Sequence, residues 1–140
     1  MNRKILFRGK RVDNGEWMEG SLLSFESGAP AIAQSKSIAL FPKEKSMISI
    51  ANCFEVIPET VGQYTGLKDK NGKQIFEGDI VRSELDYHFH MVEFVGYEFY
   101  GWCLIDMRTQ ECQYIYEYSE IEVIGNIYDN PALTEGEQDG

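Results

Sequence analysis

Hydrophobic and polar residues alternate with a period of two over much of this chain, which is the pattern of β-strands with one buried face. Residues 3–8 predict a first strand, an Asp-Asn-Gly turn follows at residues 13–15, and Glu16–Leu23 predicts the returning strand. Gly20 lies inside that second strand, where glycine indicates a bulge or a close backbone approach. The first 23 residues therefore predict a β-hairpin.

The next stretch is less regular. Residues 24–50 hold only short apolar runs, and no helical periodicity is sustained there over about 11 residues. We expect short strands and loops in this stretch. Pro58 suits the first position of a helix, so Pro58–Val61 predicts a single helical turn.

From residue 79 onward the pattern predicts five strands separated by turn residues. Their predicted bounds are Asp79–Ser83, Tyr87–Val95, Phe99–Asp106, Cys112–Tyr118 and Ile121–Tyr128. Five short antiparallel strands with bulky inward residues predict a small SH3-like or other closed barrel. We therefore expect a mainly β protein with little helix. In it, a barrel in the C-terminal half packs against an N-terminal lobe of a β-hairpin and short strands.

A shift in composition near residue 60 suggests how the chain is organised. We assign residues 1–60 to an N-terminal β lobe, residues 61–133 to a turn region plus the barrel, and residues 134–140 to a disordered acidic tail. No flexible linker separates the two lobes, so we expect them to pack together as one compact unit.

Charge is unevenly distributed along the chain. The net charge is −10, yet residues 1–60 carry eight Lys/Arg and seven Asp/Glu, whereas residues 61–140 carry five and sixteen. An acidic C-terminal half repels phosphate backbones, so nucleic acid is a disfavoured partner. The basic residues near the N-terminus form either the solvated face of a strand or an arm for an acidic partner, which could be a second copy of the chain. They are Arg3, Lys4, Arg8, Lys10 and Arg11.

Two features bear on the cellular compartment. No apolar run approaches the roughly 18–20 residues of a membrane helix, and Ile5–Phe7 is shorter than the core of a signal peptide. The three cysteines, Cys53, Cys103 and Cys112, are odd in number and form no CxxC pair, which favours buried free thiols, although Cys103 and Cys112 could approach across a hairpin. We expect a cytoplasmic protein in a bacterial host.

His88 and His90 form the first candidate for chemistry. On a strand both imidazoles would project from one face, about 6.5–7 Å apart, which suits joint metal ligation. A third ligand could come from Asp86, Glu93 or a distant cysteine. The alternative is that the histidines are half-exposed strand residues among aromatics. We assign no metal site, no cofactor and no catalytic residue.

Aromatic residues form the second candidate, since ten of the eighteen lie between Tyr87 and Tyr118. Tyr114, Tyr116 and Tyr118 alternate, so we expect them to project from one strand face as a possible partner surface. Core packing and stacking on nucleic-acid bases are the alternatives. Acidic residues surround these rings and Arg108 is the only base among them, which disfavours base stacking.

Two loop motifs complete the candidates. Asp69–Gly72 (Asp-Lys-Asn-Gly) lacks the spacing of a calcium loop, so it predicts a structural turn. The pair of carboxylates in Glu77–Asp79 has no neighbouring group to complete a catalytic set, and we interpret it as a turn leading into the barrel. No P-loop, GxGxxG, GxSxG or HExxH motif occurs in the chain.

Three segments together resemble a known family. TVGQYTGLKDKNGKQIFEGDIV at residues 60–81, ILFRGKRVDNGEWMEGSLL at residues 5–23 and IEVIGNIYDNPAL at residues 121–133 resemble the YopX family of phage and prophage proteins. The resemblance implies a β-rich protein with an SH3-like barrel portion and an unknown biochemical role. It supplies no catalytic residues. The family signature, structural or at an interface, falls on Gly62, Gln63, Thr65, Gly66, Asp69, Gly72, Glu77, Gly78, Asp79, Gly125 and Asn126.

These observations lead to one expected function and two alternatives. We expect a non-enzymatic, phage-encoded accessory protein that acts through protein–protein contacts with an unknown phage or host protein, and that forms a homo-oligomer. The first alternative is a nucleic-acid-associated SH3-like module. The second is a metal-binding protein or enzyme that uses His88 and His90.

Overall fold

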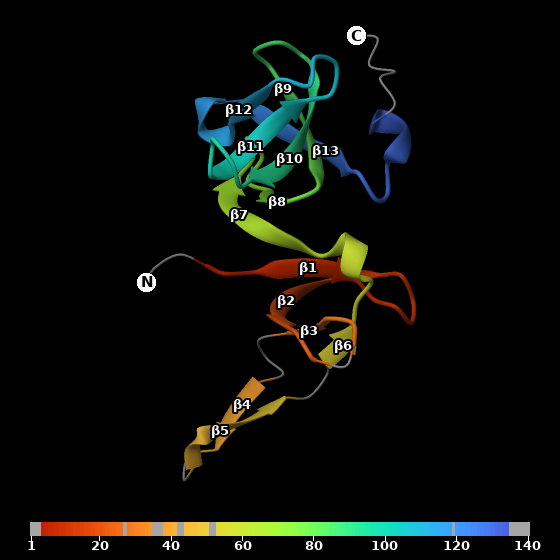
Figure 1. The fold of residues 1–140 in the computed structure, drawn as a ribbon, viewed down its shortest axis with the longest axis vertical. Coiled ribbons are helices and arrows are strands. Elements are labelled where there is room, and N and C mark those ends of the chain that lie inside the picture. The colour runs from red at the N-terminus through yellow and green to blue at the C-terminus, as the bar shows by residue number, and fades with distance from the viewer. Residues whose placement is uncertain are drawn as a thin grey trace. The chain divides into compact units, whose positions relative to one another are not determined.

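The computed structural model is mainly β (Figure 1). It divides into two compact units, which comprise residues 1–63 and residues 64–140. The described helical pieces are short 3-10 helices, so the predicted mainly β fold with little helix is confirmed. Among the residues described, no helix has the length and apolar content needed to cross a membrane. The structure describes residues 4–26, 28–34, 38–41, 44–50, 53–118 and 120–134.

Unit 1 is built around an antiparallel sheet with the order β6-β3-β2-β1, and the first residues of the next strand, β7, lie beside β1. A separate pair, β4 and β5, forms its own hairpin. The predicted first hairpin and the predicted helical turn at Pro58 are both confirmed. The bounds are β1 (Phe7–Lys10), β2 (Trp17–Leu23), β3 (Ala31–Ala33), β4 (Ile38–Phe41), β5 (Glu44–Ile50), β6 (Cys53–Glu55) and η2 (Pro58–Thr60).

Met18, Ile32 and Val56 form the buried core of unit 1. Gly20 lies in β2, next to β3, and a Cβ atom added to it would lie 2.2 Å from the carbonyl oxygen of Ala33. No side chain fits in that space, so the close backbone approach predicted for Gly20 is confirmed.

Unit 2 holds the rest of β7, which pairs with β8, and a five-stranded antiparallel sheet with the order β12-β11-β10-β9-β13 (Figure 1). The bounds are β7 (Gly62–Lys68), β8 (Gln74–Phe76), β9 (Asp79–Ser83), β10 (Phe89–Val95), β11 (Gly101–Asp106), β12 (Cys112–Tyr114), η3 (Ile115–Glu117), β13 (Ile121–Asn126) and η4 (Pro131–Thr134). Residues 135–140, which make up most of the predicted tail, lie outside the described residues.

The predicted closure of this sheet into a barrel is not confirmed. β12 and β13 are the two edges of the five-stranded sheet, and within the described ranges they do not pair with each other. The physical reason is that β12 ends at Tyr114, where the chain turns into η3. Ile115 of η3 is buried and belongs to the core of the unit. The sheet is therefore open in its hydrogen bonding.

The core of unit 2 lies on the inner face of the five-stranded sheet. It consists of Ile75, Val81, Val92, Leu104, Ile115 and Ile121, and partly buried Trp102, Tyr118 and Val123 pack against it. Fully burying an aliphatic side chain of this size contributes about 1.5–3 kcal/mol. This core fixes the positions of β10 and β11, whose outer face and loops carry the candidate site.

Candidate functional site

The predicted turn at residues 69–72 is organised by the side chain of Asp69. Its Oδ1 accepts hydrogen bonds from the amides of Asn71 at 2.8 Å and Lys73 at 2.9 Å, and its Oδ2 accepts one from the amide of Val123 at 2.9 Å. Burial raises the pKa of this carboxyl, but the three amides outweigh burial and hold the pKa below its ordinary value. All of these contacts join parts of the chain to one another.

Asp79 is fully buried, and its Oδ2 accepts a hydrogen bond from the amide of Phe76 at 2.7 Å. Gly78 has a φ of 90°, and a Cβ atom added there would lie 2.9 Å from the ring of Tyr128. These contacts within the chain account for an aspartate at position 79 and a glycine at position 78. Glu77 is partly buried beside them.

The remaining signature residues lie in β7 and at the end of β13. The Thr65 hydroxyl donates to the carbonyl of Ile75 at 2.8 Å. Asn126 Oδ1 accepts hydrogen bonds from the amides of Tyr128 and Asp129, which forms a turn after β13. A Cβ atom on Gly125 would lie 2.4 Å from Asn130 Oδ1. Gly62 and Gln63 lie in the pairing of β1 with β7, and Gly66 and Gly72 have positive φ angles.

The three tyrosines do not form the predicted ladder. Tyr114 is the last residue of β12, Tyr116 lies in η3, and Tyr118 follows η3, so they do not share one strand face. Tyr114 and Tyr116 stack with ring centroids 5.1 Å apart, and Tyr116 is exposed. Tyr118 instead packs against the ring of His90 and against the core.

A groove of about 410 Å³ runs along the outer face of the β10–β11–β12 hairpins. We call it the hairpin groove and define it by Glu93, Tyr97, Glu98, Phe99, Ile105 and Cys112. Ile105 and Cys112 are cross-strand neighbours, and Glu93 lies on the same face of the sheet because strand side chains alternate. Tyr97, Glu98 and Phe99 come from the loop between β10 and β11.

Aromatic rings and carboxylates dominate the surroundings of the hairpin groove. Phe99 packs edge-on against Tyr114, whose hydroxyl donates to the Phe99 carbonyl at 2.6 Å. Desolvation first, and then neighbouring Tyr116, raise the pKa of Tyr114, which keeps this donor protonated. Tyr97 is 70% exposed, so its ring is accessible to a partner.

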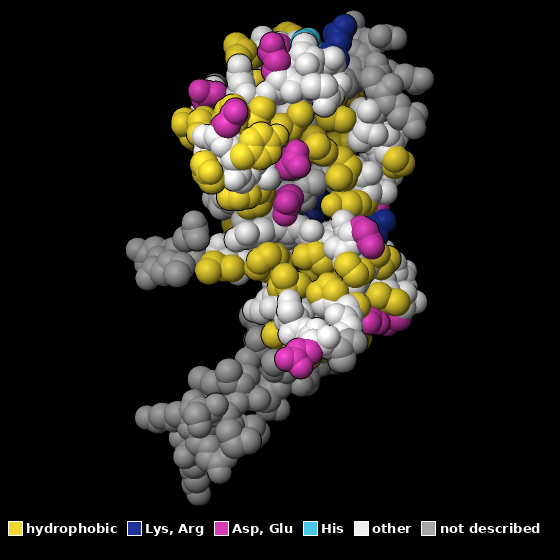
Figure 2. Space-filling view, in the orientation of Figure 1, with side chains coloured by type: hydrophobic (Ala, Val, Ile, Leu, Met, Phe, Trp, Pro, Cys, Tyr) yellow, Lys and Arg dark blue, Asp and Glu magenta, His cyan; other side chains and the backbone are white. Residues whose placement is uncertain are grey.

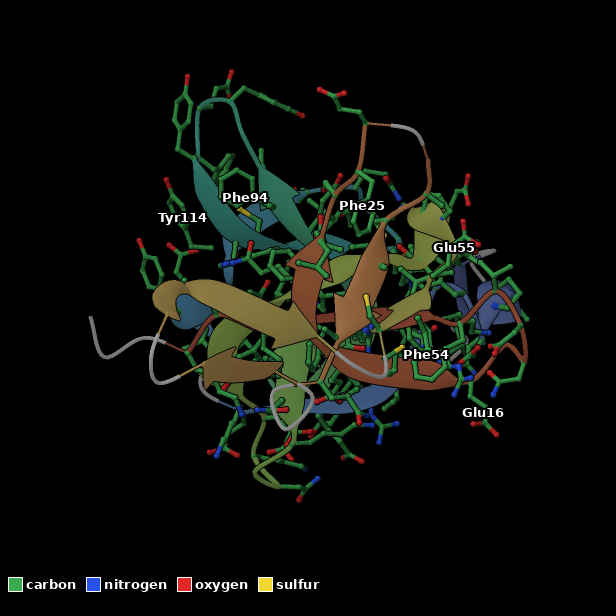
Figure 3. The ribbon with its side chains drawn as sticks, turned by 90° about the horizontal axis from the view of Figure 1, so that it is seen from below. Glu16, Phe25, Phe54, Glu55, Phe94 and Tyr114 are labelled. Atoms are coloured by element: carbon green, nitrogen blue, oxygen red, sulfur yellow. The ribbon has the colours of Figure 1, made fainter. Side chains whose placement is uncertain are left out.

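Figure 2 shows hydrophobic and acidic side chains close together over the β11 and β12 part of unit 2. Figure 3 shows Phe94 and Tyr114 beside the teal ribbons of β10 and β11. Phe94 packs against Trp102 on the other face of the hairpin, since it alternates with Glu93. Aromatic side chains therefore lie on both faces of this hairpin.

Two loop residues at the hairpin groove adopt left-handed backbone conformations. Glu98 has a φ of 58° and Gln110 has a φ of 64°. Such conformations cost non-glycine residues of order 1 kcal/mol each and are found preferentially at functional sites. The aromatic density is visible in the sequence but the groove is not, because only the register of β10, β11 and β12 places Glu93 and Cys112 on one face of the sheet.

His88 and His90 lie on one side of the hairpin, as predicted, with ring centroids 6.5 Å apart. His90 is buried in β10, and His88 precedes the strand. Of the predicted third ligands, Asp86 lies beside them, whereas Glu93 alternates onto the outer face. Asp106 also joins this cluster, although its position in the sequence gives no indication of it. The cysteines Cys53, Cys103 and Cys112 are free.

Comparison with known proteins gives a family and similar solved structures. The family model described as YopX protein matches residues 6–135. Among solved structures, protein EF1440 from Enterococcus faecalis is similar, with a TM-score of 0.67 and 28% sequence identity. The match covers 96% of this chain and 100% of that one. No curated protein matches the chain.

Proposed function

The chain belongs to the YopX family, and we propose that it is a non-enzymatic accessory protein, encoded by a phage or prophage, that binds a segment of another protein. The segment carries lysine or arginine side chains and binds in the hairpin groove. One observation carries this proposal: the groove combines an apolar floor, aromatic walls and two carboxylates in one place.

Such a groove matches the chemistry of a basic side chain. The methylene stem of lysine or arginine packs on apolar groups such as Ile105, while its charged head seeks carboxylates and aromatic faces. Glu93 and Glu98 supply the carboxylates, and Tyr97 and Phe99 supply the rings. Between residues 91 and 118 the chain has five acidic residues and one basic residue, so the surface potential also favours a basic partner.

Unit 1 contains the same kind of contact within the chain. The Arg11 guanidinium lies 3.7 Å from the centroid of the Phe54 ring and pairs with Asp13 at 2.7 Å. A cation held between a ring and a carboxylate is thus already a packing element of this protein. Phe54, labelled in Figure 3, is the ring of that pair.

The strand order of unit 2 supports a peptide-binding module. The order β13-β9-β10-β11-β12, with a 3-10 helix between β12 and β13, corresponds to that of SH3-like domains, and we propose an SH3-like topology for this unit. The alternative of nucleic-acid binding has weaker support, because the surface around the hairpin groove is acidic.

We also propose that the chain forms homo-oligomers, on the basis of its charge asymmetry. Arg8 and Lys10 both lie over Trp17, and Arg11 lies over Phe54, so part of the basic cluster has partners within unit 1. We propose separately that the groove ligand is a segment of a different protein. Light scattering tests self-association: a single mass of 16.1 kDa at tens of micromolar contradicts it.

A peptide titration tests the proposed groove. A fluorescein-labelled peptide with alternating basic and small residues is added to the full chain, and anisotropy is followed at low and at physiological salt. A glutamate version of the peptide is the ligand control. The test variant is E93Q/E98Q. The matched control is E16Q/E26Q, which removes the same charge from exposed positions of unit 1.

We expect the basic peptide to bind, the glutamate peptide not to bind, and E93Q/E98Q to weaken binding about tenfold. E16Q/E26Q should bind like the unmodified chain. If both variants weaken binding equally, the peptide is attracted by the net charge of the chain alone, and the proposed binding in the hairpin groove is wrong. Absence of binding at low salt, where electrostatic attraction is strongest, would overturn it as well.

A further inference from the structure

A cluster of carboxylates and imidazoles lies in unit 2, on the face of the β10–β11 hairpin opposite the hairpin groove. His90 and Asp106 are directly opposed in the pairing of β10 with β11. Asp86 comes from the turn before β10, where Tyr87 has a φ of 60°. We propose that Asp86, His90 and Asp106 bind one divalent transition-metal ion, with Zn²⁺ the ion that this ligand set fits best. This inference does not depend on the proposed peptide binding.

The distances between the three residues are compatible with a shared metal ion. One potential ligand atom of each residue lies within 4.8 Å of the others. His90 Nε2 and Asp86 Oδ1 are 3.3 Å apart, which is long for a hydrogen bond. Two ligands about 2.0–2.1 Å from a tetrahedral ion lie about 3.3 Å from each other, so this pair already has the spacing of two zinc ligands.

The burial of His90 is a second, independent observation. Its side chain is 1% exposed, and its Nδ1 has no hydrogen-bond partner among the described residues. The nitrogen that faces Asp86 is Nε2, so an ion bound there would not supply a partner for Nδ1; the observation that points to a ligand is the burial of a polar ring. Val92 and Leu104 occupy neighbouring positions on the same face and are fully buried and apolar. A residue kept at position 90 for packing alone would be apolar too, so the imidazole indicates a ligand.

Asp106 is oriented by groups around it. Its Oδ1 accepts hydrogen bonds from the amides of Arg108 at 2.7 Å and Thr109 at 3.2 Å, and its Oδ2 lies 2.6 Å from Nδ1 of His88. Partners of this kind commonly fix metal ligands and tune them. We assign His88 to this supporting role, because its ring contacts the carboxylate of Asp106.

The donor types narrow the choice of ion. One imidazole nitrogen and two carboxylate oxygens are ligands that Zn²⁺ accepts, and three protein ligands leave a fourth position for water or another ligand. Mn²⁺ also accepts this set, whereas Ca²⁺ and Mg²⁺ prefer oxygen alone. Asp86 is about one-third exposed in its side chain, so the ion can enter from that side.

Metal titration of the full chain provides the test. The chain is stripped with a chelator, dialysed, and titrated with ZnCl₂ in a calorimeter; MnCl₂ serves as a second probe because thiolates bind Mn²⁺ weakly. The variants are D86N, D106N and H88N, with E111Q as an exposed-carboxylate control. D106N also removes the hydrogen bonds to Arg108 and Thr109, so D86N is the decisive variant, and circular dichroism verifies that each variant folds.

We expect one Zn²⁺ per chain, a higher midpoint of thermal unfolding with Zn²⁺ than without it, and unchanged binding in E111Q. D86N should weaken binding by at least about 100-fold and abolish the thermal shift, and H88N should weaken it by about 10–100-fold. If neither Zn²⁺ nor Mn²⁺ binds stoichiometrically, the proposal is wrong. Binding that persists in D86N and D106N would reveal an adventitious ion only and would equally overturn it.

Discussion

The carboxylate of Asp69 accepts a hydrogen bond from the backbone amide of Val123 at 2.9 Å, across 54 positions of sequence. The same side chain accepts two amides of its own turn, from Asn71 and Lys73. Asp69 is buried, so water cannot replace these bonds when they are lost. Asp69 therefore connects the turn at residues 69–72 to β13, which belongs to the sheet that carries the hairpin groove.

Replacing this carboxylate should destabilise the protein. In D69N an NH₂ group replaces one carboxylate oxygen, and this donor would face a backbone N–H that needs an acceptor. The negative charge that strengthens all three hydrogen bonds is lost as well. We expect the free energy of unfolding to fall by about 3 kcal/mol at neutral pH, as measured by guanidinium denaturation. D13N, at an exposed ion pair, is the control and should change it by less than about 1 kcal/mol.

Acid should remove this contribution. The pKa of Asp69 is lower in the folded chain than in the unfolded chain, so the stabilisation is complete above the unfolded value of about 4 and is lost as pH falls through the folded value. The stability difference between the unmodified chain and D69N should therefore shrink below about pH 4. A difference that stays constant down to pH 2 would show that the charge of Asp69 is not what stabilises the turn.

Gly20 provides a test of packing in unit 1. In G20A the new methyl group would meet the Ala33 carbonyl oxygen, 2.2 Å away, and a backbone atom cannot rotate aside. We expect a loss of about 2 kcal/mol in the free energy of unfolding, through separation of β2 from β3. G96A is the matched change, because its nearest atom would be 3.7 Å away, and it should be close to neutral. Equal stability of the two variants would contradict the close approach.

Cys103 should be the slowest of the three thiols to react. It is fully buried, and burial, followed by its interaction with Cys112, raises the pKa of Cys103 to about 12. Only the thiolate is nucleophilic, so a thiol reagent at pH 8 should modify Cys53 and Cys112 first and Cys103 only after unfolding. C103A should leave the number of fast-reacting thiols unchanged. Rapid modification of all three thiols in the native chain would show that Cys103 is not protected by burial.

Much of the fold could be predicted because local signals agreed with tertiary structure. The Asp-Asn-Gly turn at residues 13–15 and the alternation beside it gave the first hairpin. The predicted strand over residues 112–118 was too long, since the alternation of Tyr114, Tyr116 and Tyr118 contains no glycine or proline to end it. Burial of Ile115 in the core outweighs the local preference and starts η3 at that residue.

The candidate sites were harder to predict, because they depend on strand register. The spacing of His88 and His90 placed both rings on one side of the hairpin, but Asp106 joins them only because the hairpin pairs it with His90. A one-residue change of register would turn Asp106 to the other face. Glu93 and Cys112 likewise share one face only through the pairing of three strands, with β11 between them.

Mapping the peptide contact by nuclear magnetic resonance tests the central claim most directly. The ¹⁵N-labelled chain is titrated with the basic peptide, and the shifts of backbone amides are followed. We predict that the largest shifts cluster at Glu93, Tyr97, Glu98 and Cys112, and that E93Q/E98Q needs about tenfold more peptide to reach them. Shifts spread over acidic residues throughout the chain, or an unchanged spectrum, would contradict the account.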